Sequence, residues 1–255
     1  MLYKNEIPIL EYDTDPTAVI APTHENLQIK LPERCVFAFL EGLADTFAKE
    51  NSCETLAQFE SCTKIYPVYK LEKDGKEICF CQGPAGSAAA VQFLDWLIGY
   101  GVKEIVAVGG CGVLVGFPEN IFLLPIKALR DEGTSYHYLQ ASRYIDLNGI
   151  AISAVAETLH KNNVPYTECM TWTTDGFYRE TKELVAYRKS EGCSVVEMEC
   201  AALAACAQFR HVLFAELLFS GDTLADTEKY NERDWGKGSH RKAFLLAVDS
   251  VINMC

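Results

Sequence analysis

The stretch from Ser194 to Asp226 reads SVVEMECAALAACAQFRHVLFAELLFSGDTLAD, and it contains two apolar runs that each end in acidic residues. The first run leads into VEME at 196–199 and the second into FSGD at 219–222. An alanine-rich helix over 200–209 is expected between them. Strands buried on both faces appear as continuous apolar runs, and open α/β sheets bind ligands at the carboxyl ends of their strands. The stretch therefore predicts an α/β fold with a site at one sheet edge.

Two interpretations of the first acidic cluster follow from the residue pattern. Side chains alternate along a strand, so Glu197 and Glu199 point the same way if the strand continues through them. Alternatively, Glu199 lies in the first turn of the following helix, where a carboxylate stabilises the helix dipole by roughly 0.3–1 kcal/mol. The pattern alone favours the second interpretation.

The rest of the chain continues the alternation of strands and helices from residue 78 onward, which favours one central sheet. No linker or internal repeat is visible, so residues 1–255 are expected to form a single domain. A hairpin turn is expected at Asp74-Gly75 and a loop at 109–112. Strands are predicted over 17–21, 35–40, 64–71, 77–81, 104–108, 121–124, 166–173 and 212–219, and helices over 44–59, 88–100, 151–162, 182–191 and 241–254.

Composition and charge exclude several classes of protein. The formal net charge of −12 argues against nucleic acid or an anionic membrane as a partner, because both select basic surfaces. The 11 cysteines include no C-x-x-C pair, and most of them lie in apolar runs. The start of the chain resembles no signal peptide, and no run of 18 apolar residues is present. We therefore expect a cytoplasmic protein with free thiols and no metal site.

Three stretches of the chain carry a resemblance to a known family. VEMECAAL at 196–203, followed by a strand and then SGD, resembles the nucleoside phosphorylase superfamily of uridine and purine nucleoside phosphorylases and their nucleosidase relatives. The glycine-rich turn, helix and strand at 83–114 and the sequence RDEGTS at 130–135 are similar to the same family. The resemblance covers about residues 15–254. It implies a single-domain fold with a mixed, partly closed central sheet and helices on both sides.

The resemblance also implies roles for individual residues. The family holds the ribose hydroxyls with a Met-Glu pair, which corresponds to Met198 and Glu199, with Glu197 beside them. An aromatic residue stacks on the nucleobase, and Phe177 takes that position. Arg179 is a further candidate for the nucleoside, since its guanidinium is a fixed fork of donors. The family's acid beside the base corresponds to Asp222, so Asp222 and Glu199 are the implied catalytic residues. The sequence YRET at 178–181 resembles an uncharacterised branch of the family.

The implied phosphate site departs from the family pattern. The family's phosphate-binding Arg falls on Ala107 and its Ser or Thr falls on Gly110, while the loop at 22–28 lacks the usual Gly-Asp-Pro and Arg. The phosphate site is therefore expected to be degenerate. The candidate ligands that remain are Gly86, Gly110, Lys127 and Arg130, although the two cations could equally be solvated loop charges.

The implied reaction is cleavage of the N-glycosidic bond of a nucleoside, in purine or pyrimidine salvage. Phosphorolysis to free base and pentose 1-phosphate is the first expectation, with phosphate as co-substrate and no other cofactor. The alternatives are a nucleoside hydrolase and a nucleoside-binding protein without turnover. Family members assemble as dimers or hexamers, so a homodimer or homohexamer is expected.

Overall fold

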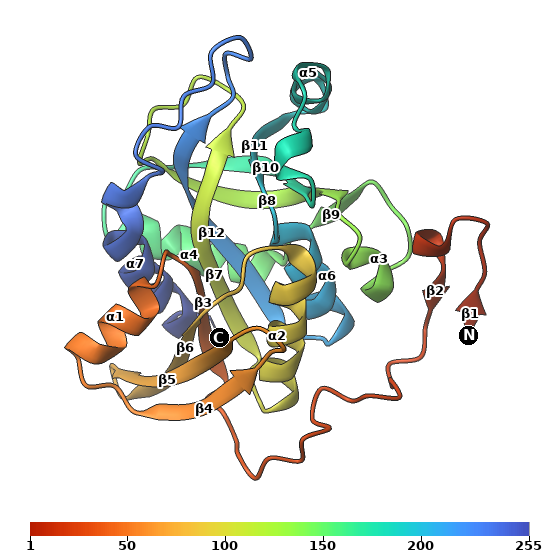
Figure 1. The fold of residues 1–255 in the computed structure, drawn as a ribbon. Helices are drawn as coiled ribbons and strands as arrows, with labels where there is room; N and C mark the ends of the chain where they lie inside the picture. Colours follow the sequence, from red (N-terminus) through yellow and green to blue (C-terminus); the bar gives the residue numbers. More distant parts are fainter. Residues whose placement is uncertain (255) are drawn as a thin grey trace.

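The computed structural model describes residues 1–254, which alternate between strands and helices along most of the chain (Figure 1). A two-stranded sheet of β1 and β2 lies at the amino terminus, and all other strands belong to one large sheet. The strands are β1 (Leu2–Tyr3), β2 (Tyr12–Asp13), β3 (Arg34–Phe39), β4 (Thr55–Glu60), β5 (Ile65–Lys73), β6 (Lys76–Gln82), β7 (Glu104–Val113), β8 (Phe122–Asp131), β9 (Tyr144–Asp146), β10 (Tyr166–Thr174), β11 (Cys193–Glu197) and β12 (Leu213–Thr223). The helices are α1 (Leu43–Glu50), α2 (Ser87–Gly99), α3 (Ser135–Tyr138), α4 (Gly149–Lys161), α5 (Lys182–Ser190), α6 (Cys200–Phe209) and α7 (His240–Ile252), with short 3-10 turns η1 (Pro8–Leu10), η2 (Phe177–Arg179) and η3 (Lys237–Ser239).

The large sheet is mixed and partly closed. Its strand order is β11-β10-β8-β12-β7-β3-β6-β5-β4, and β9 pairs with β8. An additional antiparallel pairing of β11 with β7 closes the first five strands into a barrel. β7 pairs in parallel with β12, β8 pairs in parallel with β10, and β10 pairs in parallel with β11, to which it is connected through α5. This confirms the predicted single-domain α/β fold of the phosphorylase type.

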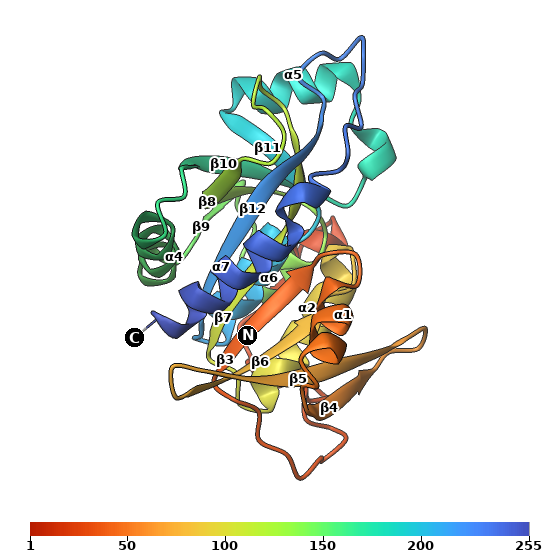
Figure 2. The ribbon, with the colours of Figure 1, turned by 90° about the vertical axis from the view of Figure 1, so that its left-hand side faces the viewer.

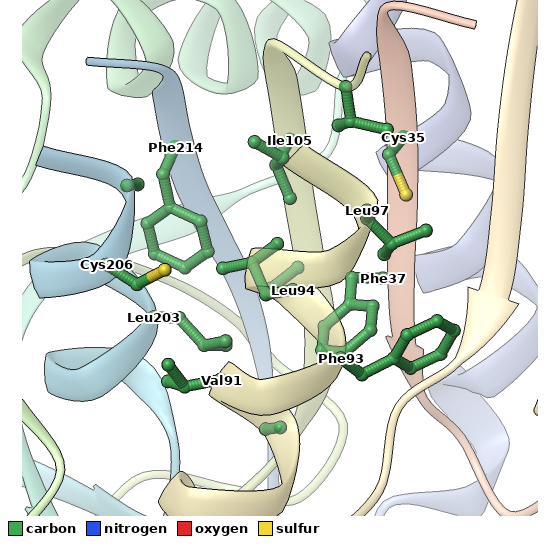
Figure 3. Packing of buried hydrophobic residues seen from close by; sticks show 14 of the residues in the cluster. Cys35, Phe37, Val91, Phe93, Leu94, Leu97, Ile105, Leu203, Cys206 and Phe214 are labelled. Carbon is green, nitrogen blue, oxygen red and sulfur yellow. The ribbon is translucent and has the colours of Figure 1, made fainter. Parts of the chain in front are cut away.

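Helices cover both sides of the sheet, as predicted. One apolar core lies between the sheet and the pair α2 and α6, and Figure 3 shows their side chains meeting those of β3, β7 and β12. A second core lies beneath α1, α4 and α7 on the opposite side (Figure 2). The alanines of α6 let it pack closely, since every residue from Cys200 to Ala207 is buried. Among residues 1–254, no helix has the length and apolar character needed to cross a membrane.

Three predicted elements differ from the structure. Residues 17–21 form no strand; they lie in an extended segment where Val19 and Ile20 are exposed. The helix expected over 44–59 ends at Glu50, and β4 follows as an antiparallel partner of β5. A left-handed Ser52 (φ 52°) breaks the helix between them, and the tertiary pairing overrides the helical pattern.

The third difference lies at the glycines after the predicted strand 104–108. Residues 109–112 are part of β7 rather than a loop, since they pair with β3, β11 and β12. A Cβ at Gly109 would lie 3.1 Å from Phe39, and one at Gly112 would lie 3.1 Å from Val196. The glycines therefore permit close packing of the sheet where β7 joins the barrel.

The cysteines described by the structure are all free thiols, and most of them are buried. Burial raises the pKa of Cys111 and of Cys200, which keeps their thiols protonated and unreactive. We expect the melting temperature to be the same with and without a reductant. Thermal unfolding followed by circular dichroism in both conditions checks this, and a drop of more than a few degrees on reduction would show a structural disulfide.

Candidate active site

The carboxyl ends of β3, β11 and β12 and the last residues of β7 meet at a cavity of about 260 Å³. Aromatic side chains and backbone form part of its wall, and five carboxyl groups form much of the rest. The carboxyl groups belong to Glu41, Glu180, Glu197, Glu199 and Asp222. The structure thus brings together both acidic clusters of the stretch 194–226, as the sheet-edge rule predicts.

Glu197 is fixed by four hydrogen bonds. The hydroxyls of Thr171 and Thr173 donate to its Oε1 at 3.0 and 2.6 Å. The backbone N–H groups of Glu199 and Cys200 donate to its Oε2, each at 2.6 Å. Glu197 therefore satisfies the start of α6, a role that the residue pattern assigned to Glu199. Both of its oxygens are engaged, so Glu197 supports the site and has little capacity left for a ligand.

Glu199 contacts a second helix start instead. Its Oε1 accepts a short hydrogen bond from the backbone N–H of Gly86, which precedes α2. Ser87 Oγ donates to the carbonyl of Met198 at 2.6 Å, so the Met198-Glu199 pair is held against the start of α2. Burial, followed by the nearby Glu197, raises the pKa of Glu199 to about 8. In the free protein Glu199 is therefore largely protonated at neutral pH. A positive charge next to Glu199 favours its ionised form.

A larger cavity of about 530 Å³ adjoins the first one. The two share Phe177, Glu180, Asp222 and Trp235 in their walls, so they form one continuous hollow. Phe177 and Trp235 are 41% and 39% exposed, and aromatic rings in a cavity wall can pack against a planar ligand. Trp235 is held by Glu119, whose Oε1 accepts from the N–H groups on both sides of it, each at 2.9 Å.

Asp222 reaches this hollow through an irregular strand end. The β12–β7 register shifts between Ser220 and Thr223, and a Cβ at Gly221 would lie 3.2 Å from the backbone of Trp235. Gly221 therefore permits the close approach of the Trp235 loop while Asp222 still faces the cavity. Burial raises the pKa of Asp222, and a hydrogen bond with the Tyr230 hydroxyl acts in the opposite direction.

The predicted cationic ligands lie elsewhere. Lys127 Nζ is 3.4 Å from Asp146 Oδ1 and lines no part of either cavity. Arg130 donates to its own loop, including Ser135 Oγ at 2.9 Å and Ser142 Oγ at 2.7 Å. Arg179 is exposed and outside both walls. In the part of the chain that the structure describes, no Lys or Arg lines the smaller cavity.

The predicted glycine ligands for phosphate are also poorly suited to it: one donates its N–H to another group, and the other has no donor side chain. The Gly86 N–H already donates to Glu199, and Gly110 lines the cavity without a hydroxyl. A side chain at Gly110 would meet the ring of Phe219 at 3.2 Å. Ala107 is fully buried in the core of the sheet, so nothing there reaches the hollow. At these positions, therefore, neither a side-chain donor nor the Gly86 N–H is left for a phosphate.

Sequence reasoning did not single out Glu41, Glu180, Trp235 or His240. Glu41 follows the apolar run of β3, which is the same signal that identified Glu197. Its backbone is left-handed (φ 46°), as is that of Gly42 (φ 80°), and such strain is concentrated at functional sites. Glu180 directly follows Arg179, and His240 begins α7. Among residues 1–254, no group of acidic, Cys and His side chains is placed to hold a metal ion.

Two known proteins are similar in sequence to part of this chain. An uncharacterized protein, R802, of Acanthamoeba polyphaga mimivirus is 29% identical over 128 residues, 50% of this chain and 49% of that protein. A purine nucleoside phosphorylase, DeoD-type 1, of Shewanella oneidensis is 26% identical over 162 residues, 56% of this chain and 67% of that protein. The chain thus spans about half the length of the viral relative.

Solved structures extend the likeness to most of the chain. Purine nucleoside phosphorylase from Toxoplasma gondii in complex with immucillin-H superposes with a TM-score of 0.74 at 16% identity, covering 92% of this chain and 96% of that one. AMP nucleosidase from Bacteroides thetaiotaomicron superposes with a TM-score of 0.70 at 20% identity, covering 87% and 88%. At these identities the superpositions describe the fold alone. The sequence profile of the phosphorylase superfamily, however, matches residues 33–252, and the chain therefore belongs to that superfamily.

Proposed function

We propose that this protein is a nucleoside hydrolase, which uses water to cleave the N-glycosidic bond and releases free base and free pentose. The observation that carries the proposal is the charge of the smaller cavity: five carboxyl groups and, among residues 1–254, no Lys or Arg in its wall. A phosphate dianion placed there is repelled, while a ribosyl cation is attracted.

Phosphorolysis was the first expectation from the sequence, and the family accommodates both acceptors. The Shewanella relative is named as a phosphorylase, and the Bacteroides structure is named as a nucleosidase. The choice therefore depends on this chain's own residues. Ala107 is buried, Gly110 has no donor side chain, and Arg130 already donates to Ser135. These three features favour water over phosphate as the acceptor.

The sugar is assigned to Met198 and Glu199. Glycosidic cleavage passes through an oxocarbenium-like transition state with positive charge on the sugar. Glu199 is mostly neutral in the free protein, because burial and Glu197 raise its pKa to about 8. The reaction proceeds from the ionised form of Glu199, which has released its proton to solvent, and its attraction for the sugar is strongest in the transition state, where it accelerates the reaction.

The remaining carboxyl groups complete the proton balance. Water attacks C1′ of the ribose as the bond from C1′ to the base nitrogen breaks. One water proton passes to Glu41, which lines the smaller cavity and whose Oε2 lies 3.9 Å from Lys237 Nζ. The leaving base takes a proton from Glu180, whose pKa is raised to about 7 by burial and then by the neighbouring Asp222.

The sugar product distinguishes the acceptors. Purified protein is incubated with adenosine, inosine, uridine and thymidine, with and without phosphate, in water enriched in oxygen-18. We expect free pentose at a phosphate-independent rate, with the label at C1. The Glu199→Gln variant, prepared in the same way, controls for a contaminating hydrolase.

Two outcomes contradict hydrolysis. Pentose 1-phosphate that forms only when phosphate is present would restore phosphorolysis. Binding of a nucleoside without any cleavage would instead favour a binding protein that retains the ribose contacts.

A further inference from the structure

The Trp235 loop, residues 224–236, follows β12 and brings the ring of Trp235 to the place where the two cavities join. Trp235 lines both cavities and is exposed. The other two tryptophans of the chain, Trp96 and Trp172, are buried in the core. Trp235 is therefore the one tryptophan that is open to a ligand, and its environment can be followed separately from the rest of the protein.

Arg233 holds the Trp235 loop from one side. Its Nη1 donates to the carbonyl of Gly221 at 3.1 Å, and its Nη2 donates to the carbonyl of Phe117 at 2.7 Å. Gly221 lies near the end of β12, whereas Phe117 lies between β7 and β8. The planar fork of the guanidinium thus bridges two elements that are distant in the sequence, which a lysine could not do in the same way.

Glu119 holds the same loop through its backbone. Its Oε1 accepts from the N–H groups of Asp234 and Gly236, each at 2.9 Å. These two residues flank Trp235, and Glu119 belongs to the segment between β7 and β8. The backbone on both sides of the ring is therefore fixed by a carboxylate from another part of the chain.

The backbone of the Trp235 loop is strained. Arg233 and Trp235 are both left-handed (φ 52° and 56°), in a region that residues other than glycine rarely adopt. A Cβ at Gly236 would lie 2.7 Å from the ring of Phe219, and one at Gly221 would lie 3.2 Å from the backbone of Trp235. Strain of this kind persists where the surroundings over-determine it, and it is concentrated at functional sites.

We propose that Arg233 and Glu119 are positioning residues, which lock the Trp235 loop so that the ring of Trp235 contacts the substrate. The proposal rests on the proposed nucleoside-cleaving function and adds a contact residue together with its support. A ring that is fixed before binding loses less conformational freedom when the substrate arrives, so its contact contributes more to affinity. A contact made equally before and during the reaction lowers KM and leaves kcat unchanged.

Fluorescence tests the contact without turnover. Acrylamide quenches exposed tryptophan, so in this protein it reports on Trp235. The probes are adenine, hypoxanthine, uracil and thymine, because free bases are not consumed by glycosidic cleavage. We expect at least one of them to protect Trp235 from acrylamide. The Trp235→Leu variant should show neither the quenching nor the protection, which assigns the signal.

Steady-state kinetics test the support, with the nucleoside that is cleaved fastest. Arg233→Met removes both bonds of the guanidinium, and Glu119→Ala removes both bonds of the carboxylate. Each should raise KM by about 10- to 100-fold, as for the loss of one aromatic contact with a base, and leave kcat within about 3-fold. Glu119→Gln keeps an amide oxygen that can accept both N–H groups, so its KM should equal that of the wild type.

Arg241→Met is the matched control. Arg241 is an exposed arginine that pairs with Glu50 at 2.8 Å and lines neither cavity. Its loss removes the same charge as Arg233→Met, and KM should equal that of the wild type.

A double variant separates positioning from a general effect on the fold. Trp235→Leu alone should raise KM by about the same factor as Arg233→Met. In the Trp235→Leu background, Arg233→Met should add little, because the ring that Arg233 positions is gone. Circular dichroism shows which variants are folded. If Arg233→Met does not fold, the comparison of Glu119→Ala with Glu119→Gln decides the same question.

Three results would overturn the proposal: no protection of Trp235 by any of the four bases, a folded Trp235→Leu variant with the wild-type KM, or effects of Arg233→Met and Trp235→Leu that multiply. Absence of all cleavage would count against the proposed function, while the fluorescence series would still decide whether Trp235 contacts a ligand.

Discussion

The Glu199→Gln variant is expected to lose about 10- to 100-fold in kcat/KM for nucleoside cleavage, since a charge-assisted contact is worth roughly 1.5–3 kcal/mol. Glutamine can still accept the N–H of Gly86 through its amide oxygen, so the junction between α2 and α6 is kept. It cannot ionise, and attraction to the ribosyl cation is lost. Steady-state kinetics at pH 7 measure the effect.

The same variant should be more stable than the wild type at alkaline pH. Burial raises the pKa of Glu199 from its ordinary 4.5 to about 8, so the folded protein holds a proton that the unfolded chain releases. The stability of the wild type therefore falls as pH rises from about 4.5 to 8, and glutamine removes this loss. The free energy of unfolding from urea titrations should be equal at pH 4 and higher for the variant at pH 8 by about 1–3 kcal/mol.

Glu132→Gln is the matched control for this pair of effects. Glu132 is buried, its pKa is raised by burial, and it lines neither cavity. Relative to the wild type, the control variant should also be more stable at alkaline pH. Its kcat/KM should equal that of the wild type. If Glu199→Gln also kept full activity, Glu199 would be only a contact between two helix starts, and its assignment to the ribose would be wrong.

The sheet and the meeting of its acidic strand ends were predictable from the sequence. Long apolar runs identify buried strands with few alternatives, and parallel strands bring their carboxyl ends to one edge. Hence Glu197, Glu199 and Asp222 could be placed together before any coordinates were known. The helix at 44–59 could not be rejected in the same way, because β4 depends on a partner strand that the local pattern does not contain.

The division of labour within the site could not be predicted. Which of Glu197 and Glu199 satisfies the start of α6 depends on Thr171 and Thr173, which lie on a neighbouring strand. That the Gly86 N–H is occupied depends on a contact across 113 residues. Local patterns describe what a residue can do, whereas these contacts decide what it does. Lys127 pairs with Asp146 on β9, and Arg130 donates to Ser135 at the start of α3, so their roles also depend on contacts that the residue pattern does not specify.

The Glu41→Gln variant is expected to lower kcat by about 10²- to 10⁴-fold, the range for removing a general base, with KM nearly unchanged. Glu41 sits at the carboxyl end of β3, and its left-handed backbone (φ 46°) is stabilised by the adjacent turn, where Gln82 Oε1 accepts from Gly42 N at 3.2 Å. Glutamine keeps the shape of the side chain but cannot take a proton from water. Single-turnover measurements with adenosine separate this chemical step from product release.

Glu50→Gln is the matched control, because Glu50 is an exposed acid on the next helix that pairs with Arg241 at 2.8 Å and lies outside both cavities. Its activity should equal that of the wild type. Stability should change little in either variant. The side chain of Glu41 is 60% exposed, and its Oε2 lies 3.9 Å from Lys237 Nζ, which makes a weak surface ion pair. Added formate should partly restore the smaller variant Glu41→Gly by supplying a carboxylate in the vacated space. Full activity of Glu41→Gln would move the base to His240, whose pKa is lowered by burial and which lines the same cavity.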